Sequence, residues 1–287
     1  MTTSIERTVE GREELHALIA AAVAQLVREW KRLTTAQDTL LHAVETIRPG
    51  PGATAGIHTA VRDFNAQVAE FDRNARAFTE RWAAQDLPVA YRDGALRALE
   101  RAGATTTLFQ WTANHQSAIT VLTATFYADL IHRVQQAVRR AQMFLRDTQA
   151  AARRVAAGSQ HSGIDPARLT ADHPLSTVIY ANNARHPVRS WASSALGWQA
   201  VLTANTAAIN TGRLELDCQW MQARDGDECG FRGHEDTDHA DGSIRSVDDA
   251  LAFPTAHFGC VREWIPRPDL NTTRGLVSGD RAPGAPL

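Results

Sequence analysis

The sequence predicts an α+β fold that is mainly α, with a long N-terminal helical bundle or hairpin arm followed by a small α+β metal-binding module. Three observations lead to this prediction. The first 157 residues carry apolar side chains at helical spacing, residues 158–175 are rich in Gly, Ser, Asp and Pro, and all three cysteines follow residue 217. We therefore expect a helical arm at 1–157, a linker at 158–175, the module at 176–268 and a disordered tail at 269–287.

The N-terminal region reads as a series of long helices. The first helix is expected to end at the PGPG sequence at 49–52, and the last to run from about Leu108 to Ala157. Between them, apolar residues step by three and four along a heptad seam: Val61, Phe64, Val68, Phe71, Ala75, Phe78 and Trp82. A loop around Asp86–Pro88 and a turn at Gly103–Ala104 are expected to separate the segments. Long helices with short connections predict an antiparallel bundle, which is a scaffold or a partner surface. The seam suits pairing within the chain and between chains equally well.

The C-terminal region reads as short strands around one helix. Strands are expected at Ser176–Tyr180, Leu216–Ala223 and Val261–Ile265, and a helix from about Pro187 to Gly212. Proline suits a first helical turn, and glycine suits the residue after a helix end. The stretch before the last strand is rich in loop-forming residues and predicts a region with a weak hydrophobic core.

Composition excludes several classes of protein. A net charge of −2 gives no reason to expect nucleic-acid binding by bulk electrostatics. No apolar stretch reaches the roughly 18 residues that a bilayer span needs, so no membrane partner is expected. The polar N-terminus does not resemble a signal peptide, which predicts a reducing cytoplasm. Clustered cysteines in that compartment bind metal or react more often than they form disulfides.

Charge is nevertheless uneven along the chain. Residues 133–154 carry six arginines against Asp147 alone, and residues 225–249 carry nine carboxylates against two arginines. The arginines are candidates for contact with DNA phosphates or with acidic groups of a protein partner, or they form a solvated helix face: Arg133, Arg139, Arg140, Arg146, Arg153 and Arg154. The acidic residues lack the ordered spacing of a calcium loop, and a solvated acidic loop is expected.

Two short pairs of cysteine and histidine predict a structural zinc site. Cys229 and His234 lie in a turn flanked by glycines, and His257 and Cys260 form an H-x2-C pair. Thiolate sulfur and imidazole nitrogen are the ligands that zinc prefers, in a tetrahedron of four. His239 is a rival for the fourth position, and a surface loop with buried cysteines and solvated histidines is the alternative. Cys218 reads as a small buried hydrophobe.

Beyond these patterns, the region from about 165 to 268 resembles phage minor head proteins of the Mu F-like or minor capsid protein 2 group, which are encoded beside the portal. The resemblance rests on motifs in the same order: Tyr180, Asn182, Arg185 and Pro187 in a turn; Asn210 and Gly212 at a helix end; Asp225 and Cys229; and His257 and Cys260. Many members carry a second cysteine where this chain has Arg232, and His234 is the nearest substitute ligand.

The resemblance implies a non-enzymatic virion protein with a zinc site. Such a protein docks at the portal inside the head and aids head assembly or DNA packaging and ejection, after assembly in the host cytoplasm. The implied partners are the portal protein, the major capsid or scaffold protein, and packaged DNA. One alternative is a metal-dependent nuclease or other hydrolase, with Glu228, Glu235 or Asp236 as base and His239 as acid. Another is a head maturation protease, for which Ser162 beside His161 is the candidate pair.

Overall fold

The structure, a computed structural model, describes residues 12–50, 52–158, 164–180, 182–225, 241–257 and 259–271. Of these residues, 73% are helical and 8% are in strands, which confirms a mainly α fold of the α+β class. The chain forms two compact units. The helical unit comprises Val23–Arg81 and Tyr127–Ala192, and the sheet unit comprises Met1–Ala22, Trp82–Phe126 and Ser193–Leu287. The boundaries of these units differ from those expected for arm, linker and module. Segments of the N-terminal half belong to the same unit as the C-terminal strands.

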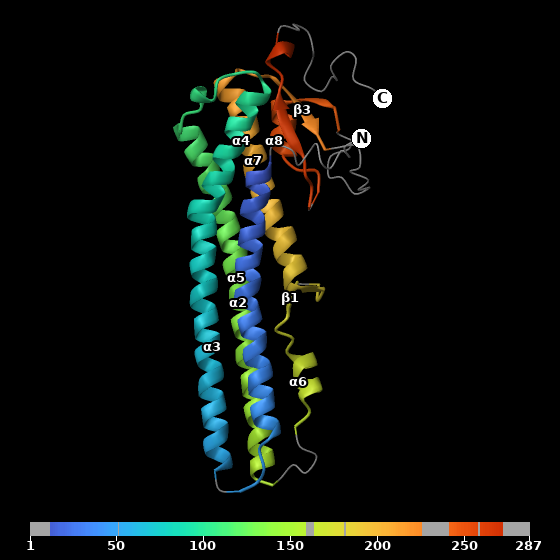
Figure 1. The fold of residues 1–287 in the computed structure, drawn as a ribbon. Helices are drawn as coiled ribbons and strands as arrows, with labels where there is room; N and C mark the ends of the chain where they lie inside the picture. Colours follow the sequence, from blue (N-terminus) through green and yellow to red (C-terminus); the bar gives the residue numbers. More distant parts are fainter. Residues whose placement is uncertain are drawn as a thin grey trace. The chain divides into compact units, whose positions relative to one another are not determined.

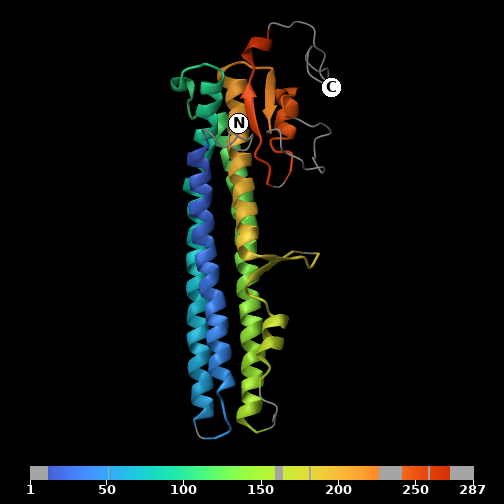
Figure 2. The same ribbon diagram turned by 45° about the vertical axis from the view of Figure 1, so that its right-hand side comes forward.

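The helical unit is built on three long helices that run side by side (Figures 1 and 2). They are α3 (Ala53–Arg81), together with the parts of α2 (Glu13–Glu45) and α5 (Ala113–Ala156) that fall in this unit. The predicted seam is confirmed from Phe64 to Phe78, where its members are buried. Trp30 packs against Phe71 and Phe64 packs against Phe144, with ring centroids 5.0 and 5.5 Å apart. Aromatic contacts between helices therefore form the core of this unit.

The described part of the predicted linker contains a helix. Residues Pro166–Asp172 form a short helix, α6, whose first turn is capped when Asp165 accepts a hydrogen bond from Arg168 N. His173 follows α6 and contacts Asp147 of α5 at 2.7 Å, while its carbonyl accepts from Gln37 of α2. A hairpin of β1 (Thr177–Ile179) and β2 (Arg185–Pro187) comes next, so the first predicted strand is confirmed.

The sheet unit begins with a change of helix type. The loop expected around Asp86–Pro88 is wrong, because a π-helical turn, η1 (Trp82–Asp86), leads directly into α4 (Leu87–Arg101). Pro88 lies in the first turn of α4, directly after η1, so its missing backbone N–H falls at the junction between the π-helical turn and α4. The turn at Gly103 is confirmed, with φ of +72°. It is followed by the 3-10 turn η2 (Thr106–Leu108) and by the start of α5.

A three-stranded antiparallel sheet forms the rest of this unit, in the order β4-β3-β5. Its strands are β3 (Trp220–Arg224), β4 (Ile244–Ser246) and β5 (Glu263–Pro266). Helix α7 (Val188–Glu215) precedes the sheet, α8 (Val247–Ala252) follows β4, and the 3-10 turn η3 (Pro268–Leu270) follows β5. The strands predicted near Leu216–Ala223 and Val261–Ile265 are confirmed with shifted bounds, whereas β4 and α8 were expected to be loop.

One hydrophobic cluster joins these elements. Its buried members come from α7, β3, α8 and β5: Ile209, Met221, Ala223, Val247, Ala250 and Trp264. Helix α4 packs closely on α7, since a Cβ added at Gly94 would lie 2.1 Å from the carbonyl oxygen of Ala204. The expectation of a weak hydrophobic core before the last strand is therefore wrong.

Candidate metal centre

The structure describes only one of the two predicted ligand pairs. Cys229 and His234, and the rival His239, lie outside the described residues. His257 and Cys260 lie in the segment that connects α8 to β5. Within the described ranges, no three His, Cys, Asp or Glu side chains gather as a metal site would require. The four-ligand zinc site thus stays a prediction, and the described residues show what surrounds its second pair.

His257 and Cys260 are the first and last residues of one turn. The backbone N–H of Cys260 donates to the carbonyl of His257 at 3.1 Å. Gly259, the third residue of this turn, has φ of +84°, a conformation that a residue with a side chain rarely adopts. The H-x2-C spacing therefore corresponds to a tight turn with a glycine where the backbone needs one.

Cys260 lies in a buried and hydrogen-bonded position. It is 3% exposed, and its Sγ accepts a hydrogen bond from the backbone N–H of Arg262 at 3.3 Å. Burial raises the pKa of the Cys260 thiol, while hydrogen bonds from the backbone of Ala256 and Arg262 lower it in part. Backbone donors of this kind stabilise a thiolate, which is the form that binds metal. A cation at Cys260 would displace the thiol proton.

A buried ion pair joins Arg262, two residues after Cys260, to Asp225. The guanidinium of Arg262 donates from Nε and Nη2 to the two carboxylate oxygens of Asp225, at 2.7 and 2.8 Å. Both side chains are almost fully buried. Asp225 N–H donates to the carboxylate of Asp241, so the residues that flank segment 226–240 also meet. Asp225 was expected in a solvated acidic loop, and that expectation is wrong because its charge is buried against Arg262.

Two further side chains hydrogen-bond to backbone carbonyls of the segment from Phe253 to Arg262. The amide of Asn205 donates to the carbonyls of Pro254 and Arg262, at 2.7 and 2.9 Å. Arg12 donates to the same Arg262 carbonyl at 3.0 Å and to the Asn205 side chain at 2.8 Å. Both ends of the segment that carries His257 and Cys260 are thereby fixed to α7 by buried hydrogen bonds.

A second buried polar group lies elsewhere in the sheet unit. Asn210 donates to the hydroxyl of Tyr91, which contacts His115 Nδ1 at 2.9 Å, and His115 Nε2 contacts Glu215 at 2.8 Å. The Glu215 carboxylate can only accept, so His115 Nε2–H donates to it, and in the neutral imidazole Nδ1 then accepts from the Tyr91 hydroxyl. Burial raises the pKa of Tyr91 to about 12, Asn210 counteracts this in part, and Glu215 adds to it. Trp111 stacks on Tyr91 and covers the group.

Sequence reasoning did not single out these residues. His115 and Glu215 are 100 residues apart and belong to no short motif. Asn210 alone was noted, as part of the motif at the end of the helix. In the structure this asparagine is the side chain of α7 that reaches Tyr91 of α4.

The arginines of α5 divide into two groups. Arg133 and Arg140 make contacts within the helical unit: Arg133 lies over the Tyr180 ring at 4.5 Å, and Arg140 donates to the Thr177 carbonyl at 2.9 Å. Burial, and Arg185 nearby, lower the pKa of Arg140. The other four side chains are exposed: Arg139, Arg146, Arg153 and Arg154. Of the six arginines predicted to contact DNA or a protein partner, these four are therefore exposed, and the contact itself stays a prediction.

Cys218 is buried, as predicted, and burial raises the pKa of its thiol to about 11. No helix in the described ranges combines the length and apolar composition needed to cross a membrane. Comparison of the chain with protein-family models, with curated proteins and with solved structures finds no match.

Proposed function

We propose that this chain is a minor head protein of a phage, a non-enzymatic component that docks at the portal inside the head. It aids head assembly or DNA packaging and ejection, contacts the portal and the capsid or scaffold protein, and binds one structural zinc ion through Cys229, His234, His257 and Cys260. The proposal rests on the motifs shared with the Mu F-like group and on where their residues lie.

One observation carries the proposal, namely that Asp225 of one motif meets the chain just after Cys260 of another. Asp225, from the segment before Cys229, forms the buried ion pair with Arg262, two residues after Cys260. Gly212, from the helix-end motif, packs so closely on β3 that an added Cβ would lie 3.0 Å from the Met221 sulfur. Contact between the segments of two motifs is expected if these two mark one module, whereas the turn motif from Tyr180 to Pro187 belongs to the helical unit.

The test is the protein content of purified particles of the phage that encodes the chain. Quantitative mass spectrometry is expected to find the protein at low copy number, and co-expression with the portal protein is expected to yield a complex. Absence from particles would overturn the virion role. Incubation with DNA and with major capsid protein, with and without a chelator, is expected to show no turnover. Any chelator-sensitive cleavage would favour a hydrolase instead.

A further inference from the structure

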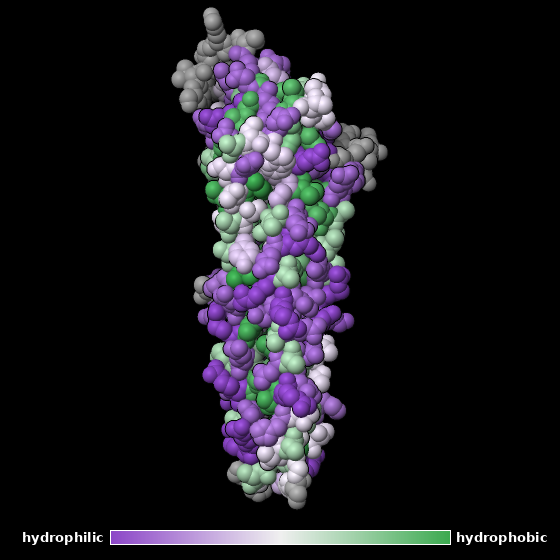
Figure 3. Space-filling view, turned by 90° about the vertical axis from the view of Figure 1, so that its left-hand side faces the viewer, coloured by the Kyte–Doolittle hydropathy of each residue, from purple (hydrophilic) through white to green (hydrophobic). Residues whose placement is uncertain are grey.

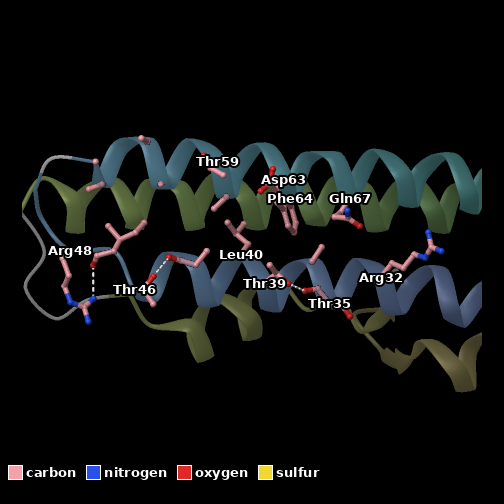
Figure 4. Close-up of a pocket in the computed structure, with 18 of the residues that line it drawn as sticks. Arg32, Thr35, Thr39, Leu40, Thr46, Arg48, Thr59, Asp63, Phe64 and Gln67 are labelled. Carbon is pink, nitrogen blue, oxygen red and sulfur yellow. Dashed lines mark hydrogen bonds between the residues drawn. The ribbon is translucent and has the colours of Figure 1, made fainter.

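The helical unit contains an open groove between α2 and α3 (Figure 4). Its volume is about 1180 Å³, and its lining on α2 extends from Arg28 to Ala43. At 1.5 Å per residue, this stretch of helix is about 24 Å long. Leu40 and Phe64 reach into the space between the two helices and form part of its floor (Figure 4).

Small side chains keep the groove open. Ala36 and Ala43 line it on α2, and Gly56 and Ala60 line it on α3. A Cβ built at Gly56 would meet no atom within 4 Å, so this wall borders open space. Figure 3 shows a face of the molecule on which apolar patches lie between hydrophilic residues. An apolar floor between small walls lets another helix approach closely.

The rim at one end of the groove is basic. Arg28, Lys31 and Arg32 line this end, and Arg32 is paired with Glu70 at 2.6 Å. Arg28 and Lys31 are exposed and take part in no ion pair within the described ranges. Asp63 is the one acidic side chain of the lining. The rim therefore offers two cations that a partner's carboxylates would neutralise.

We propose that this groove binds an amphipathic α-helix of a partner protein, with an apolar stripe on the floor and acidic residues beside Arg28 and Lys31. The length, the apolar floor and the small walls fit a helix laid along two others. Nucleic acid fits less well, because phosphate contacts need cations along the groove, and the lining between Arg32 and Arg48 carries no charged side chain. This proposal is independent of the virion role and survives if that role fails.

The first experiment measures binding of a designed peptide by fluorescence anisotropy. The probe is a helix of about 20 residues with leucines at i, i+3, i+4 and i+7 and glutamates on the flanks. A matched peptide carries lysines in place of the glutamates. The glutamate peptide is expected to bind at least about ten-fold more tightly than the lysine peptide. Equal binding of the two, or preferential binding of duplex DNA, would overturn the proposal.

Two variants connect binding to the groove. An added Cβ at Gly56 meets no atom within 4 Å, so Gly56→Leu is expected to fold normally, to project into the groove and to weaken binding at least ten-fold. Gly56→Ala is the matched control and is expected to bind as the parent does. Unchanged binding by Gly56→Leu would overturn the site. A dimer of the parent in sedimentation that Gly56→Leu dissolves would also overturn it, by assigning the groove to a second copy.

Lys31 provides an independent readout, because it is the only lysine of the chain. Carbodiimide joins an ammonium group to a carboxylate with loss of water, so it is expected to link Lys31 to a glutamate of the bound peptide. Lys31→Arg is expected to bind with near-parent affinity and to lose this cross-link. A cross-link mapped by mass spectrometry to the N-terminal amine alone would count against binding along this rim.

Discussion

Gly94→Ala should destabilise the sheet unit although alanine is the better helix former. Gly94 lies in α4, where an added Cβ would be 2.1 Å from the carbonyl oxygen of Ala204 and 2.6 Å from its carbonyl carbon. Ordinary contact begins near 3.4 Å, so relief requires a movement of about 1.3 Å. The clashing atoms are backbone atoms of α7, and no side-chain rotation moves them away.

Two opposing free energies set the magnitude. Replacing glycine by alanine within a helix stabilises by about 1 kcal/mol, whereas overpacking of a filled interface costs about 1–3 kcal/mol and sometimes more. A forced separation of two packed helices belongs at the upper end of that range. It also disturbs the 2.8 Å ion pair between Arg97 of α4 and the buried Glu263. We expect a net loss of about 2 kcal/mol in the free energy of unfolding.

Urea unfolding followed by tryptophan fluorescence and far-UV circular dichroism measures this loss. Gly197→Ala is the control, because Gly197 lies within α7 and an added Cβ there meets nothing within 4 Å. The free energy of unfolding of the control should rise by up to about 1 kcal/mol. If Gly94→Ala is as stable as Gly197→Ala, the close packing of α4 on α7 is refuted.

Four further predictions concern the buried polar groups. Asp225→Asn leaves the Arg262 charge buried without its partner and should cost about 3–5 kcal/mol in urea unfolding; a loss below 1 kcal/mol would argue against a buried pair. Burial alone would raise the pKa of Glu263, but neighbouring arginines lower it overall. The ionised Glu263 side chain therefore stabilises the fold at neutral pH, and this contribution is lost as pH falls through the lowered pKa. Acid unfolding of Glu263→Gln should accordingly depend less on pH than that of the parent. Ultraviolet titration should show one tyrosine with a pKa of about 12, a phase that Tyr91→Phe removes. Cys260→Ala should lose bound zinc in elemental analysis without loss of helical circular dichroism, and unchanged zinc content would refute the site.

The long helices could be predicted from the sequence because their apolar residues recur at 3.6-residue spacing. The seam from Phe64 to Phe78 is buried as that spacing requires. The connection at 82–88 could not be predicted, since a proline in a first helical turn and a proline in a loop look alike in sequence. Strand β4 and helix α8 are 3 and 6 residues long, too short for a periodic pattern to emerge.

At the candidate metal centre too, the local feature could be predicted from the sequence and the long-range contact could not. The spacing of His257 and Cys260 predicts a local turn, and local turns follow from short patterns. The pairing of Asp225 with Arg262 joins residues 37 positions apart and depends on the whole fold. In the sequence, Asp225 stands among other carboxylates, and nothing local separates a buried acid from a solvated one.

The hydrophobic cluster changes the role that a zinc ion would have. A zinc ion accounts for folding where the chain has too few apolar side chains to form a core. Here Met221 and Trp264 are buried in a cluster shared by two strands and two helices, and Arg262 holds Asp225 next to it. We therefore expect this core to bury its apolar surface with or without a metal. Zinc bound at Cys260 would therefore fix segments 226–240 and 253–262 locally, and chelation would change hydrogen exchange in those segments rather than unfold the sheet. Loss of the β-sheet on chelation would instead show that the sheet depends on the metal to fold.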